Sequence, residues 1–201
     1  MMRIRHIAAC LVLATGLTAP SKAALLSYTA ALNGPNEPTP SLGTGVATVD
    51  YDDILHTLRV QVSFSDLSGM VTAAHIHGPT LVPGTGTAGV ATMTPTFVGF
   101  PSGVTSGTYD HTFDLTLASS FNGAFVLGHG GSPAGAEAAL TSALAEGKSY
   151  LNIHTSMYAG GEIRGFLVPE PGALAMAVFG AAAFLPLNRS GRRRCLVFGR
   201  R

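Results

Sequence analysis

The chain has 201 residues, of which 46% are hydrophobic and 11% charged, which fits one domain with targeting segments and excludes an intrinsically disordered protein. Residues 24–168 contain three basic and ten acidic residues, a net charge of −7, and the other basic residues lie near the two ends. An acidic central region avoids polyanions, so nucleic acid is excluded as a partner.

Residues 1–23 have the order of parts found in a secretory signal peptide. Arg3 and Arg5 precede an apolar run of 11 residues at 7–17, and Ser21 and Ala23 are small residues at the −3 and −1 positions of a signal peptidase site. The alternative is a short membrane helix, but such a run is well below the ~20 residues that span a bilayer. We therefore predict cleavage by signal peptidase after Ala23.

Residues 24–167 show the alternation of a β domain, because apolar residues recur with a period of two more often than with the helical period. The segments 44–51 and 54–64 predict a hairpin with Asp50, Asp52 and Asp53 in or beside its turn, where Asp side chains bond nearby backbone groups. The alternative is a calcium site, although the ligand spacing of a calcium loop is missing. Further strands are predicted at 25–32, 71–77, 108–117, 149–154 and 162–167.

One good helical stretch is present, at 135–146, and Gly147 is its expected C-terminal cap. The segment 79–107 is rich in Gly, Thr and Pro and predicts long loops with one strand near 88–93. Seven short strands, Gly and Pro turns and one small helix predict an all-β domain. We expect an antiparallel β-sandwich or barrel with one short helix.

Histidines are the residues that suggest chemistry. Six remain after signal cleavage, and two short segments contain three of them. His75 and His77 are two residues apart, so a strand places both imidazoles on one face. In the segment 150–155, two apolar residues take the core side, which turns Asn152 and His154 outward. All three histidines are therefore expected to lie off the hydrophobic core.

His75, His77 and His154 form a candidate metal site. A His-x-His strand with a third histidine is a geometry that copper or zinc can use, since imidazole is a common ligand of both ions. The tripeptide resembles the copper-binding strand of copper/zinc superoxide dismutases, but no second histidine cluster with an Asp is present, so that activity is not inferred. The alternative is that the imidazoles bond backbone groups and one another and fix strand packing.

Other motifs give little support for catalysis. Glu162 and Arg164 are two apart on a predicted strand, and we expect a structural ion pair between them or with the histidines. No Gly-x-Ser-x-Gly motif occurs, and nothing places a nucleophile next to a base. The segment 84–86 lacks the Lys and the helix of a phosphate-binding loop, and a chain without Trp gives weak support for a sugar cleft. We therefore do not expect an enzyme.

The C-terminal segment 168–201 has three parts in a fixed order. Pro169, Glu170 and Pro171 are followed by an apolar stretch at 173–187 and then by Arg192, Arg193 and Arg194. This order resembles the PEP-CTERM sorting signal of Gram-negative exopolysaccharide producers, and the resemblance implies processing by an exosortase.

The length of the apolar stretch fits a temporary membrane anchor. A helix over 173–187 would be only ~22 Å long, which is shorter than a ~30 Å hydrocarbon core. The apolar stretch therefore predicts a weak transmembrane helix in the inner membrane. The arginines stay on the cytoplasmic side, which places the preceding residues across the membrane. Cys10 and Cys195 both lie in the targeting segments, so the mature protein is expected to contain no cysteine.

The central region also resembles a known family. The carrying segments are Ala-Ala-His-Ile-His-Gly-Pro at 73–79, Tyr-Leu-Asn-Ile-His-Thr at 150–155 and Gly-Gly-Glu-Ile-Arg-Gly at 160–165. With Ala-Leu-Asn-Gly at 31–34, they make residues 26–167 similar to the CHRD domain, named after repeats in the animal protein chordin. Tyr158-Ala159 stands where that family usually has a Pro. The resemblance implies an extracellular β domain.

We therefore expect a secreted, non-catalytic structural or binding module of the cell surface or extracellular polysaccharide matrix. Its precursor is anchored transiently in the inner membrane, and its partners are exopolysaccharide or surface proteins. The competing hypothesis is an extracellular protein that binds copper or zinc through the three histidines.

Overall fold

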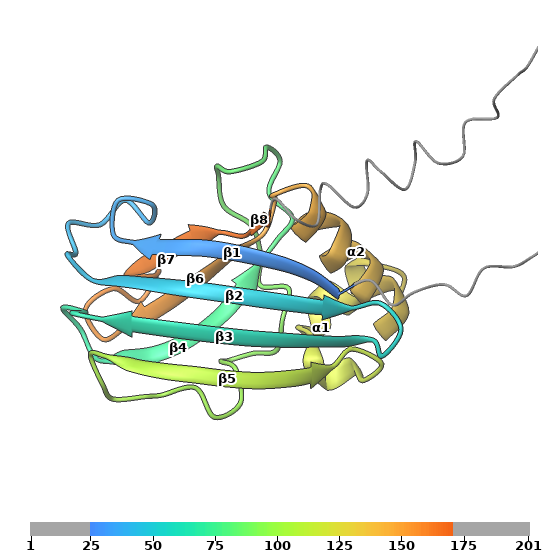
Figure 1. Ribbon diagram of the computed structural model, residues 1–201, viewed down its shortest axis with the longest axis horizontal. Helices are drawn as coiled ribbons and strands as arrows, with labels where there is room; N and C mark the ends of the chain where they lie inside the picture. The colour runs from blue at the N-terminus through green and yellow to red at the C-terminus, as the bar shows by residue number, and fades with distance from the viewer. Residues whose placement is uncertain (1–24, 171–201) are drawn as a thin grey trace, which may run out of the picture.

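The alternating strands form one curled antiparallel sheet in the computed structural model, which describes residues 25–170 (Figure 1). The strand order is β4-β6-β7-β1-β2-β3-β5, and the short β8 also pairs with β1. The predicted antiparallel β architecture is confirmed in this form. The strands are β1 (Leu25–Asn33), β2 (Thr44–Asp52), β3 (Thr57–Ser65), β4 (Val71–His77), β5 (Gly107–Asp114), β6 (Tyr150–Thr155), β7 (Ile163–Phe166) and β8 (Val168–Pro169).

The helical part is larger than the one short helix that we predicted. Helix α2 (Pro133–Ala145) covers the predicted stretch, with Ser132 as its N-cap and Gly147 in the left-handed region after its end. Helix α1 (Gly123–Gly128) and the 3-10 helix η1 (Ala118–Ser120) were not predicted, because segments this short show no helical period.

Two strands are shorter than predicted because Asp side chains form turns at their ends. The strand predicted at 54–64 begins only at Thr57, because Asp52 accepts hydrogen bonds from the backbone of the next turn, as expected for an Asp in that place. The strand predicted to reach residue 117 ends at Asp114, whose side chain bonds Thr116 and turns the chain. The strand predicted near 88–93 is only a pair of isolated bridges.

A long loop, residues 88–106, packs along the β4 edge of the curled sheet. Backbone hydrogen bonds join Ala91 to Ile76 and Phe97 to Ala74, so the loop covers the free edge of β4. Phe97 is fully buried and packs on Phe113 with ring centroids 5.4 Å apart. Burial of such a side chain contributes roughly 2 kcal/mol. The loop therefore belongs to the core as well as to the surface.

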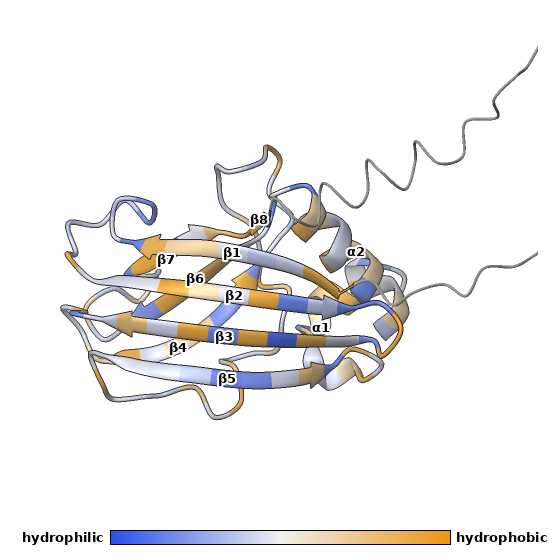
Figure 2. Ribbon diagram, viewed as in Figure 1, coloured by the Kyte–Doolittle hydropathy of each residue, from blue (hydrophilic) through white to orange (hydrophobic). Residues whose placement is uncertain are grey.

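The core lies inside the curl and under the helices. Apolar and polar residues alternate along the strands in Figure 2, as expected when one face of a sheet is buried. On β3, Leu58, Val60, Val62 and Phe64 are all buried, while Arg59 points outward to Asp110. The period-two pattern in the sequence thus identifies the core face.

The two ends of the described chain lie side by side. Strand β8 pairs with β1, and the backbone N–H of Glu170 donates to Ser27 at 3.0 Å. Pro169 and Glu170 of the predicted sorting motif are therefore held at the sheet. No helix within residues 25–170 is long and apolar enough to cross a membrane. The predicted cleavage site at Ala23, the predicted transmembrane helix at 173–187, and Pro171, Arg192, Arg193 and Arg194 lie outside the described residues.

Candidate metal centre

Strands β4 and β6 place the three candidate histidines on one face of the sheet. Ile76 is fully buried in the core, so His75 and His77 point to the opposite face. The antiparallel register pairs His154 with Ala73, which precedes His75 by two residues. The three imidazole rings consequently gather, with centroids 4.6 to 6.0 Å apart.

Each imidazole is oriented by a backbone carbonyl group from a loop. The Nδ1–O distances are 3.3 Å from His75 to Pro95, 2.8 Å from His77 to Ala88 and 2.9 Å from His154 to Ala159. A carbonyl oxygen only accepts hydrogen bonds, so each Nδ1 carries the hydrogen and donates it. In the neutral ring the free lone pair then resides on Nε2. Metal-binding histidines commonly have this same arrangement.

The Nε2 atoms are the nitrogens left to bind a cation. Those of His75 and His154 are 2.9 Å apart, and Nε2 of His77 is buried without a hydrogen-bond partner among residues 25–170. One ligand nitrogen from each histidine lies within 4.8 Å of the others. Two lone pairs at hydrogen-bond distance repel each other unless a proton or a cation lies between them. The cluster therefore has donor atoms that small shifts of the rings could bring around one metal ion.

Burial keeps these imidazoles neutral. The pKa of His75 is lowered to about 3, first by desolvation and then by the neighbouring His77 and His154. Desolvation also lowers the pKa of His77 to about 4 and lowers the pKa of His154. Metal ions bind the neutral form of imidazole, so protons compete weakly for this site near neutral pH.

An aromatic and cationic stack borders the cluster. The Tyr150 ring stacks on His77 with centroids 4.7 Å apart, and the guanidinium carbon of Arg164 lies 4.8 Å from the Tyr150 centroid. Arg164 Nε is 3.0 Å from a carboxylate oxygen of Glu37. The expected pairing of Arg164 with Glu162 or the histidines is wrong, because β7 pairs with the end of β1 and brings Arg164 to the loop that carries Glu37.

Glu162 instead forms a buried structural centre. Its side chain is fully buried and accepts hydrogen bonds from Ser41 Oγ at 2.6 Å, Thr155 Oγ1 at 2.7 Å, and the backbone N–H groups of Ser68 at 2.5 Å and Gly69 at 3.0 Å. Burial alone would raise the pKa of this carboxyl, but these hydrogen bonds outweigh it and lower the pKa. No sequence signal marked this role, since the partners come from three separate segments.

The histidine face is more covered than we predicted. Asn152 does point away from the core, but it is only 2% exposed, and His75 is 7% exposed. The side-chain amide of Asn152 donates to the carbonyl of Gly160, whose loop folds over this face. Strand alternation predicts the side on which a residue lies but not whether a loop covers that side.

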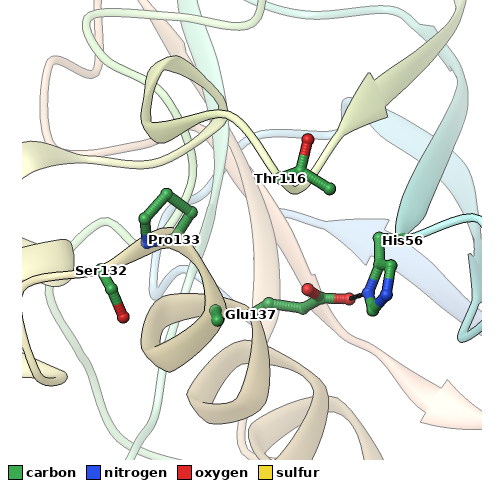
Figure 3. A pocket seen from close by; sticks show the side chains of 6 residues that line it. His56, Thr116, Ser132, Pro133 and Glu137 are labelled. Atoms are coloured by element: carbon green, nitrogen blue, oxygen red, sulfur yellow. Dashed lines mark hydrogen bonds and ion pairs between the residues drawn. The ribbon is translucent and has the colours of Figure 1, made fainter.

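A second polar site lies near the start of helix α2 (Figure 3). His56 Nδ1 is 2.9 Å from Glu137, and the same carboxylate oxygen accepts a hydrogen bond from Tyr51 at 2.8 Å. Ser132 lies on the far side of the pocket from His56 and accepts a hydrogen bond from the backbone N–H of Gly135. His56 therefore has no serine beside it here, and the pair ties the helix to the hairpin between β2 and β3.

The fold and the site define a class: a small antiparallel β domain with a covered histidine cluster on the face opposite its core. The CHRD domain family matches residues 28–167, and the chain belongs to this family. CHRD domains occur in secreted or extracellular proteins. The resemblance inferred from the sequence over 26–167 is thus confirmed for the CHRD domain. A search of curated proteins and a search of solved structures gave no match.

Proposed function

We propose that this CHRD domain is an extracellular module that binds one copper or zinc ion through His75, His77 and His154. The observation that carries the proposal is the arrangement of the ring nitrogens: loop carbonyls hold all three Nδ1 atoms, which leaves the Nε2 lone pairs for a metal. Copper and zinc are the ions for which imidazole is a common ligand.

The competing function is a purely structural or binding module in which the histidines only pack two strands. A contact between His75 and His154 at 2.9 Å would fit that function if one ring held an additional proton. It would leave Nε2 of His77 buried and unpaired. Three other buried side-chain atoms of residues 25–170 also have no hydrogen-bond partner, but of these four atoms only this nitrogen belongs to the group of close ligand residues. The unpaired nitrogen therefore favours the metal-binding function.

Metal content of the purified full chain, measured by mass spectrometry after loading with copper or zinc and desalting, tests this proposal. We expect close to one ion per chain, and loss of that ion in the His75→Ala/His77→Ala variant. His129→Ala is the matched control, because His129 Nδ1 also bonds a backbone carbonyl, that of Phe125 at 2.8 Å, outside the cluster. A folded wild type that retains no metal, or equal loss in the control, would contradict the proposal.

We further propose that the protein is exported and sorted by its two end segments, after which it resides at the cell surface or in the exopolysaccharide matrix. Its partners would be signal peptidase, exosortase and then exopolysaccharide or surface proteins, without catalysis by the domain itself. Support comes from the order of the C-terminal parts and from Glu170, whose backbone bonds Ser27 and holds the start of the motif beside β1.

Cell fractionation of a host with an exosortase tests the export proposal. Replacement of Pro169, Glu170 and Pro171 by Ala should leave an unprocessed precursor in the membrane fraction, while wild type reaches the surface or the medium. The control is a Glu146→Ala variant, which replaces an exposed acid outside the sorting motif and should be sorted like wild type. Normal processing of the triple variant would overturn the sorting proposal.

A further inference from the structure

Resting on the proposed metal site, we infer that the site selects Cu(I) over divalent zinc and copper. The first observation is the charge of the donor set. Within residues 25–170, the group of close ligand residues contains three histidines and no acid or cysteine. Neutral imidazoles leave the charge of the bound ion uncompensated, so a divalent ion would remain +2 and Cu(I) would remain +1.

Burial turns this difference in charge into selectivity. His75 is 7% exposed, His77 and His154 are half-buried, and the loops that carry Ala88, Pro95 and Ala159 contact the three rings. The cost of moving an ion from water into a poorly solvated site rises with the square of its charge in the Born treatment. A monovalent ion therefore pays a much smaller desolvation penalty here than a divalent ion.

The fixed charges of Arg164 and Glu37 beside the cluster offset each other. Arg164 lies over Tyr150, which in turn stacks on His77, so a guanidinium cation borders the site. Glu37, which contacts Arg164 at 3.0 Å, is already engaged in that ion pair. This pair therefore adds no net negative charge beside the cluster that would offset a second positive charge on the metal.

The number of ligands also favours Cu(I). A d¹⁰ monovalent copper ion is satisfied by three nitrogen donors, whereas Zn(II) completes a tetrahedron and Cu(II) prefers tetragonal coordination. The loop carbonyls fix the three rings, and within residues 25–170 the cluster contains no fourth His, Cys, Asp or Glu ligand. Zinc or Cu(II) would have to recruit water into a partly buried site.

Competition titrations on the full chain, purified in mild detergent, test the inference. Cu(I) is titrated without oxygen against bicinchoninate, and Zn(II) is titrated against a chromophoric zinc chelator. We expect one Cu(I) per chain, bound at least about 100-fold more tightly than Zn(II). Zinc binding of equal or greater strength would overturn the Cu(I) inference but leave the proposed metal site intact, whereas failure to bind either ion would overturn both.

A single added carboxylate tests the charge argument directly. Ala73 lies opposite His154 and two residues before His75, so Ala73→Asp places an anionic ligand beside the cluster. We expect this variant to lower the preference for Cu(I) by at least about tenfold. Thr72→Asp is the control, because it adds the same charge at an exposed neighbouring position. An unchanged preference in Ala73→Asp, or an equal change in both variants, would overturn the inference.

Discussion

Among single residues, Glu162 is fully buried and its carboxylate accepts four hydrogen bonds. In Glu162→Gln one carboxylate oxygen becomes an NH₂ group, so a buried backbone N–H of Ser68 or Gly69 loses its acceptor. We expect a loss of about 3 kcal/mol in the free energy of unfolding, measured by urea denaturation. Glu146→Gln, which removes an exposed ion pair with Lys148, should cost much less, because exposed ion pairs contribute little to stability. Equal losses would contradict the role assigned to Glu162.

The histidine site could be predicted from the sequence only in part. Two residues of separation put His75 and His77 on one face, and apolar neighbours put His154 on the corresponding face of its own strand. The carbonyl partners could not be predicted, because Ala88 and Pro95 lie in a long loop without a period. The predicted partner of Arg164 was wrong because its actual partner, Glu37, lies far away in the sequence.

The turn between β6 and β7 positions one ligand. Gly161 has φ +132, which disfavours any side chain, and a Cβ there would lie 2.3 Å from the Asn152 side chain, so Gly161→Ala must displace this turn or Asn152. The turn also carries Ala159, whose carbonyl orients His154. We expect Gly161→Ala to weaken metal binding about tenfold or more without removing a ligand.

The adjacent glycine provides the control for that substitution. A Cβ on Gly160 has nothing within 4 Å, and its φ lies outside the left-handed region, so Gly160→Ala should bind metal like wild type. The measurement is the same chelator competition for both variants. Unchanged metal affinity in Gly161→Ala would show that the turn does not position His154.

The hairpin between β2 and β3 is linked to helix α2 by a pH-dependent contact. The hydrogen bond from His56 to Glu137, and then the charge of Glu137, raise the pKa of His56 above its ordinary 6.5. A raised pKa stabilises the folded state at pH below 6.5, and this contribution is lost as the pH rises through the folded pKa.

Urea denaturation of wild type and His56→Gln between about pH 5 and about pH 9 tests this contact. Wild type should be the more stable protein at the acidic end, and the difference in unfolding free energy should shrink as the pH rises. A difference that is constant with pH, or that grows toward alkaline pH, would contradict the assigned contact.

For the whole molecule, alternation along the strands predicted the all-β architecture and most strand positions. It could not predict how the sheet curls, because the curl depends on pairing between segments as distant as β1 and β7. It also could not show that the loop at 88–106 closes the β4 edge, since Phe97 is a core residue within a Gly- and Pro-rich stretch. Tertiary contacts, rather than local preference, determine both features.

The central claim is that three imidazoles from two strands bind one metal ion. X-ray absorption at the metal K edge, recorded on the full chain loaded with one equivalent of copper or zinc, tests it most directly. We expect a shell of three imidazole nitrogens at about 2.0 Å from the ion. A spectrum dominated by oxygen ligands, or one that is unchanged in the His75→Ala/His77→Ala variant, would contradict the claim.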